Sequence, residues 1–98
     1  MRISIKQEGT ILTLALEGEL STPTAPQLEE ALPPGMKGVD QLILDASELL
    51  YLSSAGLRII LKARQELEGR GGVTVRNASK ELMDIFEVTG FDDLLTFE

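Results

Sequence analysis

Two adjacent hydroxyl side chains, Ser53 and Ser54, lie in the segment of the sequence whose residue types and spacing most suggest a chemical role. They precede a long pattern of helical spacing, which places them at the start of a helix. At such a position backbone N–H groups lack partners and the positive end of the helix dipole is exposed, so the site suits negative charge. Helix statistics alone favour a structural interpretation, with Ser53 as the N-cap and Ser54 as an ordinary first-turn residue.

Enzymatic function is not expected. The chain contains no His and no Cys, which excludes the usual nucleophile triads, zinc sites and disulfides. Ser54 also lacks the Gly-x-Ser-x-Gly context of a hydrolase nucleophile. The carboxylates of Glu19, Asp45 and Glu48 could be considered as a divalent-ion cluster, but acidic residues at strand ends are more often solvated. We therefore expect no catalytic residue, no metal site and no cofactor.

The charge and length of the chain limit its partners. Nine Lys and Arg residues stand against sixteen Asp and Glu residues, for a net charge of −7, so binding to nucleic acid is not expected. With 98 residues and 43% hydrophobic content, the chain fits one globular domain over residues 1–98. No window resembles a signal peptide or approaches the ~20 apolar residues of a membrane span. A cytoplasmic location without membrane insertion is the expectation.

The first third of the chain predicts a hairpin followed by a short helix. Alternating apolar residues near the N-terminus indicate a strand, and Gly9 supplies a turn into a second strand over 10–16. The strand pattern then breaks, and Thr24 with Gln27 forms a capping box for a helix. A Pro-Pro-Gly run ends that helix.

The remaining elements follow the same reasoning. Apolar residues predict a central strand over 39–44, ended by Asp45 and followed by a loop over 46–52. A long helix then buries Gly56, Ile60, Ala63 and Leu67. Further along, the sequence predicts a strand over 73–75, a third helix capped by Ser79 with apolar positions Leu82, Ile85 and Phe86, and an edge strand within 91–97.

Together these elements predict an α/β fold in the order β-β-α-β-α-β-α-β. Crossovers between parallel strands are right-handed, so the helices should pack on one face of a mixed sheet of about five strands.

Three motifs, in order, resemble the STAS domain family, and in particular the bacterial anti-sigma factor antagonists. The first is an apolar strand ending in Asp45, a short loop, and then Tyr-Leu-Ser-Ser-Ala-Gly-Leu-Arg over 51–58. The second is Gly-Glu-Leu over 18–20 followed by Thr24-Ala25 and Leu28. The third comprises Ser79, Leu82, Ile85-Phe86, Gly90-Phe91 and Leu94. The resemblance covers almost the whole chain.

This resemblance implies a protein controlled by phosphorylation. The serine two positions before the helix glycine, here Ser54, is the one that a partner kinase phosphorylates in the family; Ser53 is the second choice. The unmodified domain would bind an anti-sigma factor that is also a serine kinase and so free the sigma factor. Phosphorylation would end the interaction and a serine phosphatase would restore it. The implied partner-binding residues are Ser21, Thr22, Tyr51, Leu52, Ser53, Ser54, Ala55, Gly56 and Arg58.

Three alternatives stay open at the level of sequence. The chain could be an accessory or ligand-sensing STAS domain of a membrane transport complex. Tyr51 and Leu52 could anchor a partner, although packing in the core is favoured. Gly56, unusual in a first helical turn, indicates close approach of another group or a packing contact within the domain.

Overall fold

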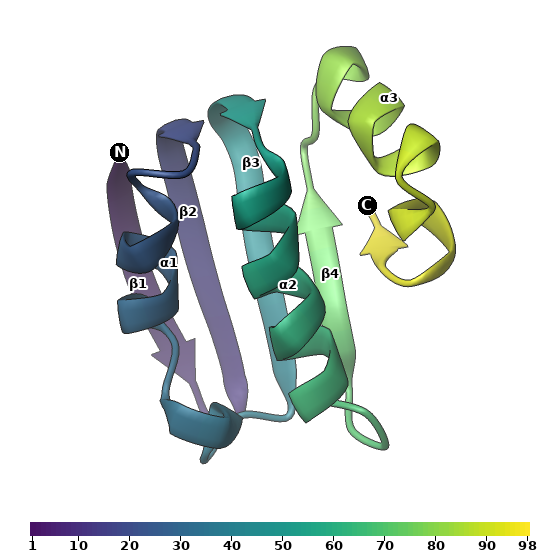
Figure 1. Ribbon diagram of the computed structural model, residues 1–98. Helices are drawn as coiled ribbons and strands as arrows, with labels where there is room; N and C mark the ends of the chain where they lie inside the picture. Colours follow the sequence, from purple (N-terminus) through teal and green to yellow (C-terminus); the bar gives the residue numbers. More distant parts are fainter.

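Five strands and three helices alternate along the chain in the order predicted from the sequence. The computed structural model describes all 98 residues (Figure 1). Two short 3₁₀ turns, Pro34–Met36 and Phe91–Asp93, complete the structure. The strands are β1 (Arg2–Glu8), β2 (Ile11–Leu20), β3 (Gln41–Leu52), β4 (Gly72–Arg76) and β5 (Thr96–Phe97), and the helices are α1 (Ala25–Ala31), α2 (Ser54–Glu66) and α3 (Lys80–Val88).

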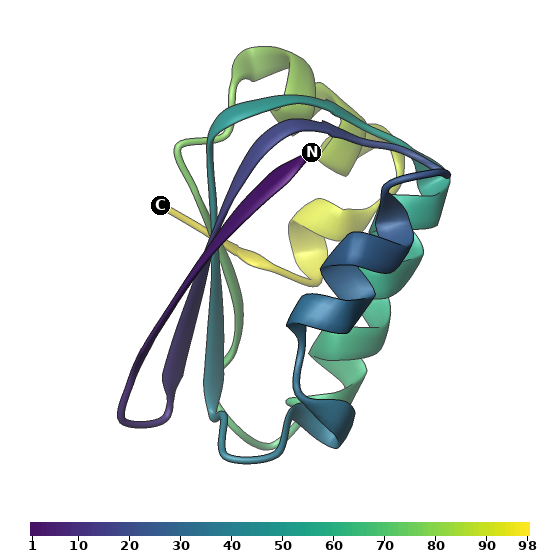
Figure 2. The ribbon, with the colours of Figure 1, turned by 90° about the vertical axis from the view of Figure 1, so that its left-hand side faces the viewer.

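The strands form one mixed sheet in the spatial order β1-β2-β3-β4-β5. β1 and β2 are antiparallel and all later neighbours are parallel. Helices α1 and α2 lie side by side on one face of this sheet, while α3 lies near β4 and the C-terminal strand (Figures 1 and 2). The opposite face carries no helix. The α/β fold with a five-stranded mixed sheet is therefore confirmed.

The core lies between the sheet and the helices. Alternate residues of the three central strands point into it, among them Leu14, Leu44 and Val75. The inward positions predicted for α2 are all buried, as the spacing of four, three and four residues requires. On α3, Phe86 is 2% exposed and meets Phe97 of β5 in an edge-to-face contact, with ring centroids 5.2 Å apart.

Strands β2 and β3 are longer than predicted. The sequence placed their ends at residues 16 and 44, yet they run to Leu20 and Leu52. β4 pairs with β3 only as far as Asp45, and beyond this point β2 and β3 pair with each other alone. Register shifts between Ala15 and Glu17 and after Gly18 interrupt the apolar alternation, which is why the sequence indicated a loop over 46–52.

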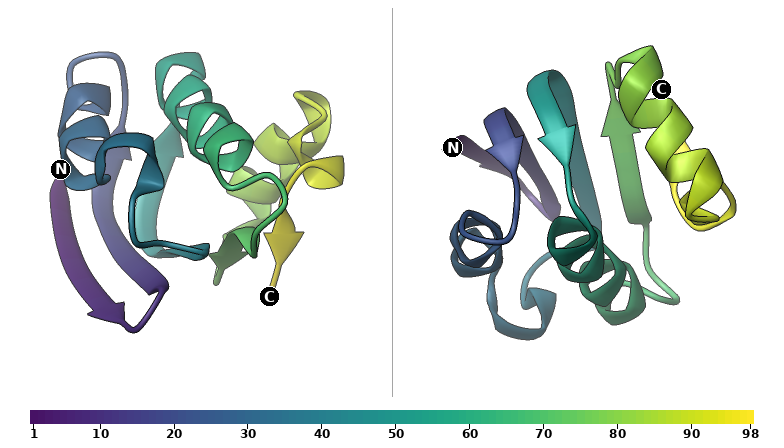
Figure 3. Two further views of the ribbon diagram at one scale, coloured as in Figure 1. Left: turned by 90° about the horizontal axis from the view of Figure 1, so that it is seen from below. Right: turned by 45° about the horizontal axis from the view of Figure 1, so that its top comes forward.

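The two-stranded extension of β2 and β3 determines where the helices begin. It curves over toward the helical face, so that both strands end beside the first turns of α1 and α2 (Figures 2 and 3). Bulged antiparallel or parallel pairs bend more strongly than regular ones. The bend carries Leu20 and Leu52, which are paired neighbours, to the same end of the molecule as the start of α2.

The predicted capping box at α1 is not formed. Thr24 occupies the N-cap position, but its side chain makes no bond to the helix. The Thr24 hydroxyl instead donates to the carbonyl oxygen of Glu19 at 2.7 Å and accepts from the backbone N–H of Ser21 at 2.8 Å. Local side-chain bonds of threonine compete with capping, and here they close the turn that follows β2.

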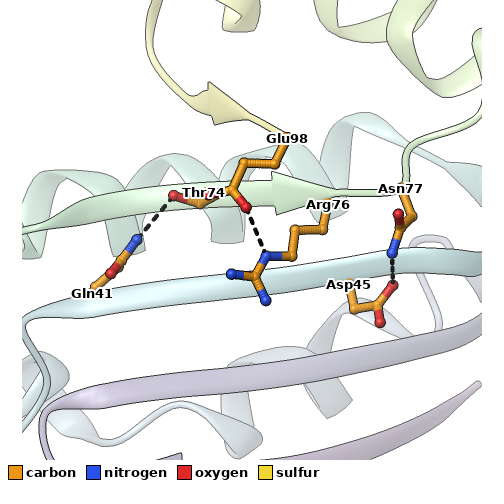
Figure 4. Close-up of polar contacts among 6 residues, drawn as sticks. All are labelled: Gln41, Asp45, Thr74, Arg76, Asn77 and Glu98. Carbon is orange, nitrogen blue, oxygen red and sulfur yellow. Dashed lines mark hydrogen bonds and ion pairs between the residues drawn. The ribbon is translucent and has the colours of Figure 1, made fainter.

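Polar side chains form contacts across the face of the sheet that no helix covers. The side-chain amide of Gln41 donates to the hydroxyl of Thr74 at 3.1 Å, and Thr74 is only 2% exposed. Arg76 pairs with Glu98 at 3.0 Å, which ties the C-terminus to β4 (Figure 4). The contact with Gln41 gives the buried Thr74 hydroxyl a partner, whereas the Arg76–Glu98 pair lies at the exposed surface.

Acid is expected to weaken the fold partly through Asp45. Hydrogen bonds lower the pKa of this carboxyl below its model-compound value of 3.8, chiefly the one from the backbone N–H of Ser47, with a further one from Asn77. Burial acts in the opposite direction. Because the folded-state pKa lies below the unfolded one, the stabilisation is complete above about pH 4 and disappears as the pH falls through the folded-state value.

Asp45→Asn tests this effect. The variant should unfold more easily than the unmodified chain near neutral pH, and the difference in unfolding free energy should shrink as the pH falls below about 4. Urea titrations of both proteins across this range measure it. A difference that does not change with pH would contradict the assignment.

Candidate functional site

Ser53 is the N-cap of α2, as predicted. Its backbone is extended, with φ −96° and ψ 171°, and its hydroxyl accepts a hydrogen bond from the backbone N–H of Gly56 at 3.5 Å. Its own N–H donates to the carbonyl oxygen of Leu20 at 2.9 Å. The side chain is half-buried. Ser53 therefore joins the start of α2 to the end of β2, and its hydroxyl is used for this structural role.

Ser54 is the first residue of α2 and has a different environment. It is exposed, and its hydroxyl makes no hydrogen bond within the protein. The backbone N–H groups of Ser54 and Ala55 also lack an acceptor in the protein, since the bonds of the first turn are made by Gly56 and Leu57. A free hydroxyl thus lies next to two free backbone donors at the positive end of the helix dipole.

Gly56 lets the start of α2 approach the sheet closely. A Cβ atom at this position would lie 2.5 Å from Cγ and 2.7 Å from Cδ2 of Leu20, and 3.1 Å from Cδ1 of Leu52. Both leucines are buried at the paired ends of β2 and β3. Of the two explanations left open by the sequence, the packing contact within the domain is the one present.

The two segments predicted to bind a partner lie next to each other. Leu20 and Leu52 are register partners, so the turn after β2 adjoins the turn that leads into α2. Ser21 is half-buried in the hydrogen-bonded turn closed by Thr24, and Thr22 is exposed. Because Ser53 also bonds to Leu20, the residues around Ser21 and those around Ser54 form one continuous surface.

Exposed apolar side chains precede the serines. Leu50 is 77% exposed and Tyr51 is 48% exposed, whereas Leu52 is 2% exposed. The interpretation that favoured the core is thus correct for Leu52 and wrong for Tyr51. The bulged register of β3 is responsible, because it places Leu50 and Tyr51 consecutively outside the core. The sequence analysis did not single out Leu50. The signal for it was an apolar run that is longer than the alternation of a half-buried strand requires.

Charged residues surround this surface. Glu17 and Glu48 are register partners, and Glu19 pairs with Tyr51, so acidic side chains lie at the ends of β2 and β3. Arg58 is exposed one helical turn after Ser54, on the same side of α2. No three acidic side chains lie close enough together to hold a metal ion.

Comparison with known protein families identifies the chain. Residues 3–96 match the family described as "Mlab, STAS domain". The chain belongs to the STAS domain family. The match includes every strand and helix of the structure except the first residue of β1 and the last of β5, so the resemblance in the sequence motifs extends to the whole fold.

Relatives of this STAS domain include anti-sigma factor antagonists. The chain is 30% identical over 93 residues to BtrV of Bordetella bronchiseptica, named as an anti-sigma factor antagonist, covering 93% of this chain and 80% of BtrV. It is 25% identical to the anti-sigma-B factor antagonist of Bacillus subtilis, covering 97% and 88%. The phosphorylated form of the Bacillus cell fate determinant SpoIIAA has the same fold, with a TM-score of 0.76, 19% identity, and coverage of 99% and 91%.

A membrane span is not found among the helices. The longest of them, α2, has 13 residues, and none combines the length and the apolar content needed to cross a bilayer.

Proposed function

We propose that this STAS domain is an anti-sigma factor antagonist that binds an anti-sigma factor through the surface around the start of α2. In unmodified form it would occupy the anti-sigma factor and so free the sigma factor. Phosphorylation of Ser54 by the anti-sigma factor, acting as a serine kinase, would end binding, and a phosphatase would restore it. The domain is the substrate in this scheme and requires no catalytic residue of its own.

The observation that carries this proposal is the different use of the two serines. The Ser53 hydroxyl caps α2, whereas the Ser54 hydroxyl is exposed and free. A phosphate on Ser54 adds nearly two negative charges and three acceptor oxygens. The free N–H groups of Ser54 and Ala55 can donate to it, and Arg58 lies one turn away. These groups support the proposal that the start of α2 accommodates a phosphate on Ser54.

The surface around Ser54 also suits a protein partner. The exposed side chains of Leu50 and Tyr51 provide apolar contact area, and aromatic residues are enriched among the residues that dominate binding energy. Glu19 and Glu48 give the surrounding surface an acidic character. An added phosphate would place further negative charge at an interface formed by the neutral serine, so the complex would lose affinity through desolvation and like-charge contact.

Phosphorylation of purified variants by the anti-sigma factor kinases encoded in the same genome tests the proposal. The unmodified chain should gain one phosphate at Ser54, located by mass spectrometry of its peptides. Ser54→Ala should gain none. Ser53→Ala, although less stable by about 1 kcal/mol because the N-cap is lost, should still be phosphorylated. Phosphate on Ser53, or on neither serine with every kinase, would contradict the proposal.

The match to the family described as "Mlab, STAS domain" is compatible with both roles that the sequence left open. An accessory or ligand-sensing role in a membrane transport complex therefore stays the second candidate. In that case the start of α2 would contact a transporter subunit. Isolation of the endogenous protein separates the two: a transporter subunit as the stable partner, with both serines unmodified under growth and stress, would favour the second.

A further inference from the structure

The outer edge of β1 has no neighbour in the protein. β1 lies at the end of the sheet order and pairs with β2 on one side only (Figure 1). Its seven residues, Arg-Ile-Ser-Ile-Lys-Gln-Glu, include no proline or glycine, and no register shift interrupts its pairing with β2. Such an edge presents a regular row of unpaired backbone N–H and C=O groups.

We propose that two copies of this chain associate through antiparallel pairing of their β1 strands, with Ile5 of one copy opposite Ile5 of the other. The two sheets would then form one continuous sheet across a two-fold axis. This arrangement is closed, because each copy uses its single β1 edge and leaves none free for a third.

The hairpin determines which residues of β1 direct their backbone groups outward. Glu8 and Ile11 close a two-residue turn in which Gly9 has a φ of +61°, as a type II′ turn requires. The closing pair of this turn exchanges backbone hydrogen bonds, and such pairs alternate with non-bonded ones along an antiparallel ladder. The residues with N–H and C=O groups directed to the outer edge are therefore Ile3, Ile5 and Gln7.

Charge selects one register for the pairing. Among the registers in which outward-directed groups meet, those that pair most of β1 have the two-fold axis at Ile5 or at one of its immediate neighbours. An axis at Ser4 places Arg2 opposite Lys6, and an axis at Lys6 places Lys6 opposite itself. Both juxtapose like charges, which is destabilising for residues directly opposite each other. An axis at Ile5 instead places Arg2 of each copy opposite Glu8 of the other, which gives two oppositely charged pairs. It also lets the outward backbone groups of the two Ile5 residues bond to each other.

The same register accounts for an exposed apolar side chain. Ile5 is 59% exposed although it lies in the middle of a strand, beside the buried Leu14 of β2 on the helical side of the sheet. With Ile5 on the axis, the two isoleucines become direct cross-strand neighbours and shield each other from water.

The proposed association leaves the Ser54 surface open. β2 lies between β1 and β3 in the sheet, and α2 begins at the end of β3. Because the two β1 strands run antiparallel, the two Ser54 surfaces would lie toward opposite ends of the pair. The association is therefore independent of the proposed function and can be tested without an anti-sigma factor.

Exchanging the charges at the β1 edge tests the proposal. Association is measured by sedimentation equilibrium at increasing protein concentrations. Arg2→Glu and Glu8→Arg should each weaken association by about tenfold or more, since each creates two like-charged pairs. The double variant should restore it. Glu68→Arg changes the net charge as Glu8→Arg does, at an exposed position after α2, and should have no effect. Monomers at every concentration up to about 1 mM, or no recovery in the double variant, would overturn the proposal.

A cross-linking variant provides a second readout. The chain has no cysteine, so Ile5→Cys introduces a single thiol at the proposed axis, where opposite Cα atoms at about 5.5 Å are within reach of a disulfide. Mild oxidation should convert this variant to a covalent dimer. Ile11 is also exposed, at 40%, but lies on β2, and the Ile11→Cys variant should remain monomeric. Equal cross-linking of both variants would overturn the proposed axis.

Discussion

Ser54→Asp is expected to weaken binding to the cognate anti-sigma factor by about a hundredfold or more. A charged group placed in an interface that was formed around a small neutral one costs several kcal/mol through desolvation and repulsion, and about 1.4 kcal/mol corresponds to a factor of ten in affinity. Ser54→Ala keeps the surface neutral and should bind nearly as well as the unmodified chain. Isothermal titration calorimetry measures both affinities.

A matched control separates local charge from total charge. Gln65→Glu also adds one negative charge to an exposed position of α2, but at the opposite end of the helix from Ser54. It should leave the affinity within about twofold, because exposed charges beyond roughly 10 Å are largely screened. If Gln65→Glu weakened binding as much as Ser54→Asp does, net charge would be responsible rather than the Ser54 surface.

Gly56→Val is expected to lower the unfolding free energy by about 3 kcal/mol, with Gly56→Ala costing about 1–2 kcal/mol. The new Cβ would lie 2.5 Å from Cγ of Leu20, an atom of a side chain that is fully buried in the core. Alanine recovers part of this cost through its better helix propensity, worth about 1 kcal/mol. Urea unfolding of the series measures the effect.

A double-mutant cycle shows whether Leu20 is the cause. Leu20→Ala removes the colliding atoms and should itself cost about 2–5 kcal/mol, since Leu20 is fully buried. In that background Gly56→Ala should stabilise the protein, because the two shorter contacts with Leu20 are gone, only the 3.1 Å approach to Cδ1 of Leu52 is left, and the new methyl group fills part of the cavity. If Gly56→Ala cost the same in both backgrounds, the close approach of α2 to Leu20 would not explain the glycine.

Local sequence signals were sufficient for the central elements of this fold. The helical spacing from Gly56 to Leu67 predicted the buried face of α2, and the apolar run at 42–44 predicted a central strand. Each of these segments packs against the core over its whole length, so burial imposes a regular period on the sequence. The caps Ser53 and Ser79 could also be predicted, because capping depends only on residues within one helical turn.

Signals that depend on groups outside the element itself were misread. The second half of β3 follows β2 through two register shifts, and its apolar residues therefore lose their alternation. Thr24 has the sequence of a capping residue, yet the nearby carbonyl oxygen of Glu19 takes its hydroxyl. In both cases, the outcome depended on groups that the curved extension of β2 brought close.

In the candidate site, too, some features follow from local sequence and others from tertiary contacts. The sequence by itself determined that hydroxyls would meet free backbone donors at the start of α2, because helix termini leave N–H groups unpaired whatever the surrounding fold. Which serine is free was decided by tertiary structure, since Ser53 must bond to both Leu20 and Gly56 to hold α2 against the sheet. The same close approach, made possible by Gly56, leaves Ser54 exposed. Contacts between residues far apart in the chain thus turned two equivalent hydroxyls into a structural one and an available one.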